Sequence, residues 1–63
     1  MKRALLAKME KIIANKIAAK KEMGENYDFM EIKRFVINMH AEELGEERDS
    51  YSSELSRRFT FRK

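Results

Sequence analysis

Few residues of this chain belong to the types that do chemistry, and their spacing does not bring them together. His40 is the single histidine, and the sequence contains no cysteine. Zinc frameworks and thiol nucleophiles are therefore excluded, and no second imidazole exists to share a metal with His40. We interpret His40 as a structural histidine at the edge of an apolar helix face, paired with a carboxylate or water. No enzyme activity and no cofactor are predicted.

An acidic cluster follows the histidine, formed by Glu42, Glu43, Glu46 and Glu47. Carboxylate oxygens can bind Mg²⁺ or Ca²⁺, but the Asp-rich loop of a calcium site is missing from the sequence. A run of acidic residues is more often the solvated end of a helix. The cluster is therefore interpreted as a helix end, and no metal site is predicted.

Basic residues offer a second kind of chemistry, contact with phosphates. The chain has 14 Lys and Arg against 11 Asp and Glu, a formal net charge of +3. Lysines lie all around the first segment, and near the C-terminus four basic residues flank two phenylalanines. Such residues neutralise phosphates and stack on unpaired bases. The candidates for nucleic-acid binding are Lys8, Lys11, Lys16, Lys20, Lys21, Arg57, Arg58 and Arg62.

The charges are sorted along the chain. Residues 1–23 carry seven bases against two acids, whereas residues 24–44 carry two bases against five acids. A basic segment followed by an acidic one suits two helices that pack against each other. Packing of this kind neutralises much of the basic segment, which argues against a continuous positive surface.

The first helix is predicted over about residues 2–23. This segment lacks proline and glycine, and strong helix formers fill it. Its apolar stripe repeats at helical spacing, and Gly24 follows as a left-handed C-cap. Lys16 and Lys20 fall inside the stripe, where their aliphatic stems can cover apolar surface.

The second helix is predicted over about residues 28–44. Asp28 and Glu31 have the spacing of a capping box at its start. The apolar arc of this helix covers roughly 220°, about twice what packing on one neighbour requires. Phe35 and Val36 lie within that arc and are expected among the most buried residues.

A short third helix is predicted over about residues 46–59, because Tyr51, Leu55 and Phe59 recur every four residues. Residues 60–63 are expected to fray as a basic tail. The predicted fold is therefore all-α, a single small domain in which an antiparallel helical hairpin precedes a short third helix. Sixty-three residues without disulfides or metals need reinforcement. We expect two copies to pair through the surplus apolar face of the second helix, forming a four-helix core.

These features predict a small non-enzymatic regulator, adaptor or inhibitor that binds a protein partner and also forms a homodimer. Nucleic-acid binding is the alternative. No apolar run is long enough to cross a membrane, and charged residues interrupt the N-terminal segment too early for a signal peptide, so a cytoplasmic location is expected. The candidate partner-binding residues are Lys16, Lys20, Met30, Ile37, Phe59 and Phe61.

Overall fold

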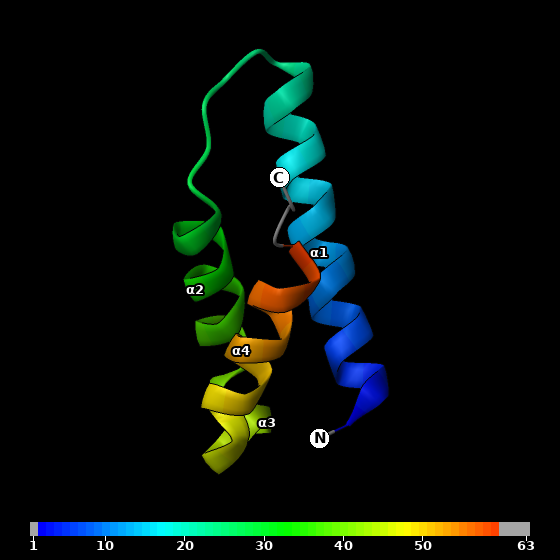
Figure 1. Ribbon diagram of the computed structural model, residues 1–63, viewed down its shortest axis with the longest axis vertical. Helices are drawn as coiled ribbons and strands as arrows, with labels where there is room; N and C mark the ends of the chain where they lie inside the picture. Colours follow the sequence, from blue (N-terminus) through cyan, green and yellow to red (C-terminus); the bar gives the residue numbers. More distant parts are fainter. Residues whose placement is uncertain (1, 60–63) are drawn as a thin grey trace.

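The protein is all-helical, as Figure 1 shows for the computed structural model, which describes residues 2–59. Its elements are α1 (Arg3–Glu22), α2 (Phe29–Met39), α3 (Ala41–Leu44), the 3₁₀ turn η1 (Gly45–Glu47) and α4 (Arg48–Phe59). No strand occurs among the described residues. The predicted all-α class is confirmed.

Gly24 ends α1 with a left-handed backbone, at φ +71°. Its N–H donates to the carbonyl of Lys21, and the N–H of Glu25 donates to the carbonyl of Lys20, at 3.1 and 2.9 Å. These two bonds form a Schellman motif, which satisfies carbonyls that the last helical turn leaves free. The chain then leaves α1 and turns back toward the bundle (Figure 1).

Asp28 starts α2, because its Oδ1 accepts the N–H of Met30 at 3.0 Å. Glu31 lies in the first turn, where a negative charge favours the helix dipole. From there α2 runs back beside α1 in the opposite direction (Figure 1). α4 then packs against both helices.

His40 interrupts the helix that was predicted to run from residue 28 to residue 44. Its backbone N–H donates to Ile37 O at 3.1 Å instead of continuing the α-helical pattern. The imidazole Nδ1 lies 2.8 Å from Val36 O and donates to it, because a carbonyl can only accept. The side chain thus supplies the bond that the backbone gives up, and the predicted single helix becomes α2 and α3.

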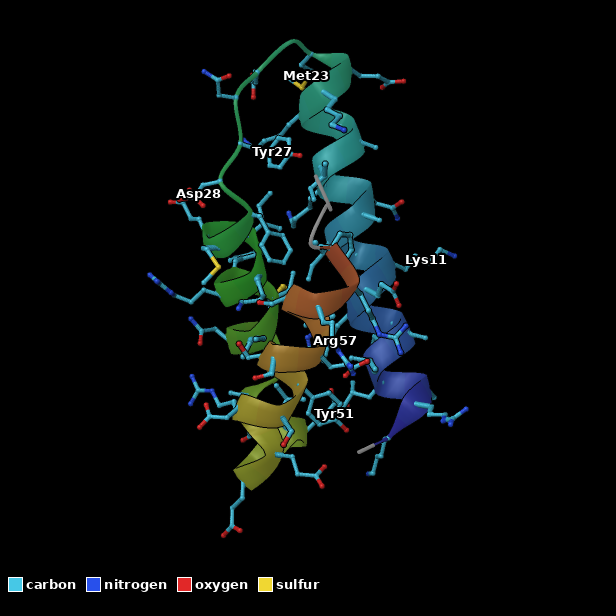
Figure 2. The ribbon with its side chains drawn as sticks, viewed as in Figure 1. Lys11, Met23, Tyr27, Asp28, Tyr51 and Arg57 are labelled. Carbon is cyan, nitrogen blue, oxygen red and sulfur yellow. The ribbon has the colours of Figure 1, made fainter. Side chains whose placement is uncertain are left out.

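Gly45 joins α3 to the 3₁₀ turn with φ +56° and ψ −128°. A residue with a Cβ atom rarely adopts this backbone conformation. α4 follows, and Tyr51 and Leu55 are buried on its inner side. Figure 2 shows Tyr51 on α4 near the start of α1, where its hydroxyl accepts the N–H of Lys2 at 2.7 Å.

The core lies between α1, α2 and α4. Its most enclosed side chains are apolar or aromatic and come from all three helices. The prediction for Val36 was right, because this residue is fully buried, but the prediction for Phe35 was wrong, because 52% of its surface is exposed. The buried apolar residues are Leu6, Met9, Ile13, Ile32, Val36, Ile37, Leu44, Tyr51 and Leu55.

Candidate protein-binding surface

α4 covers only one side of the pair formed by α1 and α2. On that side of α2, Lys33 Nζ donates to Ser56 Oγ at 2.7 Å, although Lys33 is almost completely buried. The rings of Phe29 and Phe59 lie 5.4 Å apart at the same junction. The opposite flank of α2 faces away from these contacts, because Phe35 lies two residues beyond Lys33 in the helix.

We call the uncovered side the open face. It is a groove with residues of α1 along one side and residues of α2 and α3 along the other. Two hollows mark its ends, one lined by Lys16, Lys20, Glu31 and Phe35, the other by Leu5, Lys8 and Glu43. Ile12 and Met39 lie between them, each one helical turn from a lining residue. The open face therefore consists of Leu5, Lys8, Ile12, Lys16, Lys20, Glu31, Phe35, Met39 and Glu43.

Two large apolar side chains of the open face are more than half exposed. Phe35 is 52% exposed and Met39 is 57% exposed, and they are adjacent because they lie four residues apart on α2. The ammonium group of Lys16 lies 5.0 Å from the centre of the Phe35 ring. This cation–π contact places the ammonium group over the ring, and 52% of the surface of Phe35 remains exposed.

The charges of the open face are divided between its two sides. The α1 side carries Lys8, Lys16 and Lys20, and the α2–α3 side carries Glu31 and Glu43. Lys20 pairs with Glu25 across the connection at 3.6 Å. The open face thus combines an apolar centre with a basic side and an acidic side.

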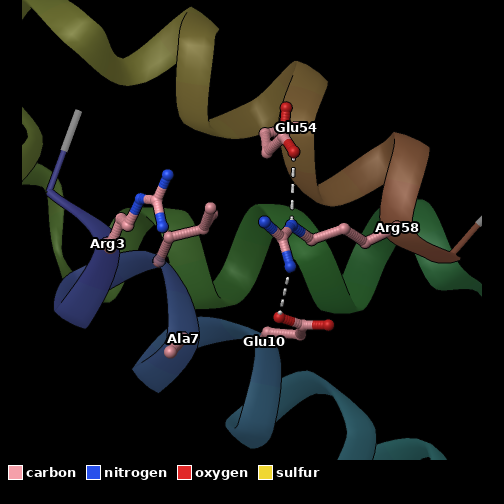
Figure 3. A pocket seen from close by; sticks show the side chains of 6 residues that line it. Arg3, Ala7, Glu10, Glu54 and Arg58 are labelled. Carbon is pink, nitrogen blue, oxygen red and sulfur yellow. Dashed lines mark hydrogen bonds and ion pairs between the residues drawn. The ribbon is translucent and has the colours of Figure 1, made fainter.

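A second surface, the seam between α1 and α4, holds an ionic network. Arg58 bonds Glu10 of α1 at 3.2 Å and Glu54 of its own helix at 3.3 Å, as the dashed lines in Figure 3 show. Arg57 also pairs with Glu54, and this hydrogen bond is the main reason that the pKa of Glu54 is below its ordinary value. The network connects α4 to α1, and its two arginines are paired with its two glutamates. The seam is therefore a structural contact.

The predicted partner-binding residues are split by the fold. Lys16 and Lys20 belong to the open face. Ile37 is only 6% exposed within the core, so it is removed from the candidate surface. Phe59 is half-buried against Phe29, and Met30 is exposed on a different flank of α2 from Phe35. Phe61 lies outside the described residues. Phe35 and Met39 were not among the predicted partner-binding residues, and Phe35 was missed as a surface residue because its place in the apolar arc indicated core.

The predicted nucleic-acid-binding residues do not form one surface. Lys11 points away from the bundle, and Figure 2 shows it on the outer side of α1. Lys8 and Lys16 line the open face, whereas Lys21 lies in the last turn of α1. Arg57 and Arg58 are paired with carboxylates of the seam. Arg62 lies outside the described residues.

Within the described residues, no group of three or more His, Asp or Glu side chains is placed to hold a metal ion. The acidic residues of the predicted helix end are exposed around α3 and η1. No helix in this part of the chain is long and apolar enough to cross a membrane. Comparison with protein-family models, with curated proteins and with solved structures found no match.

Proposed function

We propose that this protein is a small non-enzymatic regulator or adaptor, and that the open face binds a protein helix. The exposed pair of Phe35 and Met39 carries the proposal. Aromatic and methionine side chains are enriched at the centre of protein interfaces, and charged residues surround that centre. The open face has this composition, with an apolar centre between lysines and glutamates.

Two features of the open face support a helical partner. It lies between two antiparallel helices (Figure 1), and its exposed apolar side chains, Phe35 and Met39, are spaced one helical turn apart. An amphipathic helix recognises its partner through residues at this spacing. Methionine adapts to the shape of the partner because its side chain is unbranched and flexible.

The predicted homodimer with a four-helix core belongs to the same proposal, because the open face is the apolar surface that α4 leaves uncovered. Nucleic-acid binding is the second candidate. Lys8, Lys11 and Lys21 favour it, since they form no ion pair among the described residues. They lie on different sides of α1, which is unfavourable for tracking one phosphate backbone.

The experiment uses immobilised protein to capture partners from native lysate, with and without nuclease. We expect the double substitution Phe35→Ser with Met39→Ser to weaken capture by about 30-fold or more, the equivalent of losing about 2 kcal/mol at an interface centre. Met30→Ser is the matched control, because Met30 is 51% exposed but lies outside the open face. It should capture as the wild type does.

Nuclease treatment separates the two candidate functions. Capture of protein that survives nuclease and depends on Phe35 and Met39 supports the proposal. Capture that disappears with nuclease, or that is unaffected by the double substitution, would contradict it. Substitution of Lys11 and Lys21 by glutamate should then weaken binding if nucleic acid is the partner.

A further inference from the structure

We propose that the occupant of the open face is a second copy of this chain, arranged about a two-fold axis that runs along the groove between α1 and α2. This inference rests on the proposed function, in which the open face binds a protein helix. It names the partner and fixes how the two copies are oriented.

The distribution of charge on the open face carries the inference. A two-fold axis along the groove places α1 of one copy over the α2–α3 side of the other. Lys16 and Lys20 then lie opposite Glu31 of the second copy, because all three line the same end of the groove. Lys8 lies opposite Glu43 of the second copy for the same reason at the other end. Every charged position of the face thereby meets the opposite sign.

In the reversed arrangement, a two-fold axis that runs across the helices, instead of along the groove, would bring like charges together. An axis across the helices places α1 over α1 of the second copy, running in opposite directions. Lys16 then lies near Lys8 of the second copy, and Glu31 lies near Glu43. Like charges held together at an interface disfavour association by several kcal/mol. The charge pattern thus selects one orientation of the two copies.

Four of the five charged groups of the face are available for such pairing, whereas Lys20 already pairs with Glu25 at 3.6 Å. Among the described residues, Lys8, Lys16, Glu31 and Glu43 form no ion pair within the chain. Lys16 instead lies over the Phe35 ring, beside the position that a facing glutamate would occupy. An interface that pairs a basic side with an acidic side of the same surface is self-complementary, as two-fold symmetry requires.

The apolar part of the face also fits this arrangement. Ile12 from α1 and Met39 from α2 lie between the two hollows, next to the proposed axis, and Phe35 lies one helical turn from Met39 at one end. The axis keeps helix directions unchanged, so α1 of one copy neighbours α2 of the other in antiparallel orientation. The four helices then alternate in direction, as in an up-and-down four-helix bundle. α4 of each copy lies outside, on the side it already covers.

A pair of charge-swap variants tests the inference. The acidic variant carries Lys16→Glu and Lys20→Glu, and the basic variant carries Glu31→Lys, so that all changes lie at one end of the open face. All three positions are on the open face, so circular dichroism should show that both variants keep their helices. By light scattering at micromolar concentration, we expect a dimer for the wild type, a monomer for each variant alone, and a dimer for their equimolar mixture.

The matched control carries Lys11→Glu and Lys21→Glu, which makes the same change in net charge as the acidic variant. Lys11 lies on the outer side of α1 (Figure 2), and Lys21 lines neither hollow of the open face. It should remain dimeric. A monomeric control, or variants that stay dimeric alone, would overturn the arrangement.

Other outcomes separate this inference from the proposed function. A wild-type monomer over the whole micromolar range would overturn the second copy as occupant. The proposed function would still hold if Phe35→Ser with Met39→Ser abolished capture of another protein. A monomeric wild type whose capture of protein did not depend on Phe35 and Met39 would overturn the second copy as occupant and the proposed function together.

The absence of cysteine from the chain allows a direct check of orientation. Under oxidation, a mixture of the Lys16→Cys and Glu31→Cys proteins should form the mixed disulfide. The reversed arrangement would instead join Lys16→Cys to Lys8→Cys. Disulfides form only when the two Cα atoms come within about 7 Å, so this comparison distinguishes the two orientations.

Discussion

At the scale of the residue, Phe35 shows why burial is harder to predict than secondary structure. Its position in the apolar arc of α2 is as favourable for the core as that of Val36. The two differ because α4 packs against the flank that carries Phe29 and Lys33 and leaves the flank of Phe35 uncovered. The sequence indicates how wide an apolar arc is, but not which part of it a third helix will cover.

Lys33 is the opposite case, a charged residue that the fold buries. Its neighbours in the sequence gave no reason to expect burial. In the structure its aliphatic stem packs between α2 and α4, and the ammonium group reaches Ser56 Oγ and lies 5.9 Å from the Phe29 ring. Ser56 lies 23 positions away from Lys33, and local sequence patterns do not reveal such a partner.

Glu54 carries a prediction about acid stability. Its hydrogen bond to Arg57 lowers the pKa of this carboxyl in the folded protein, and the charges of Arg57 and Arg58 act in the same direction. A lowered folded-state pKa contributes stability above the unfolded-state pKa, and that contribution is lost as the pH falls through the folded-state value. Glu54→Gln should therefore have a lower Tm than the wild type at neutral pH.

The difference in Tm should shrink below about pH 4, where the carboxyl becomes protonated in the unfolded chain and then in the folded one. The effect is small, because exposed ion pairs are screened by solvent. Glu46→Gln is a suitable control, since it removes an exposed carboxylate that lies outside the α-helices and away from the seam. A Tm difference for Glu54→Gln that stayed constant into the acid range would contradict this account.

At the scale of the element, starts and ends were easier to predict than interruptions. Gly24 and Asp28 act locally, since the C-cap and the N-cap depend only on residues nearby in the sequence. The break at His40 depends on its side chain, which bonds the carbonyl of Val36 where the backbone N–H of His40 bonds Ile37 instead. Histidine is common within helices, so its type and spacing do not distinguish this role.

Gly45 gives the prediction at this scale. Gly45→Ala should lower the free energy of unfolding by about 1–3 kcal/mol, because its backbone conformation is strained for a residue with a Cβ atom. The cost comes from the backbone alone, since nothing lies within 4 Å of the added Cβ. Urea unfolding followed by circular dichroism measures the change.

The neighbouring substitution Glu46→Ala serves as the control for Gly45→Ala, because Glu46 is exposed and has ordinary backbone geometry in the same turn. It should unfold nearly as the wild type does. Equal stability of Gly45→Ala and Glu46→Ala would show that the connection between α3 and α4 tolerates a different path.

For the whole molecule, the open face is a consequence of the small size, because few residues remain to cover α1 and α2. A chain of 63 residues without disulfides has a small core. In this fold α4 covers the pair formed by α1 and α2 on one side only (Figure 1). The all-helical fold followed from periodicity and caps. The position of α4 did not, because it depends on contacts between residues far apart in the sequence, such as Glu10 with Arg58 and Lys2 with Tyr51.

Methionine methyl NMR reports whether a protein helix covers the open face. Met39 and Met30 have nearly equal exposure in the isolated chain, at 57% and 51%. Only Met39 lies on the open face. With a soluble paramagnetic agent added at micromolar protein concentration, we expect the Met30 methyl to relax as an exposed group and the Met39 methyl to be protected. Phe35→Ser should remove that protection, and equal relaxation of both methyls in the wild type would contradict a second copy as the occupant of the open face.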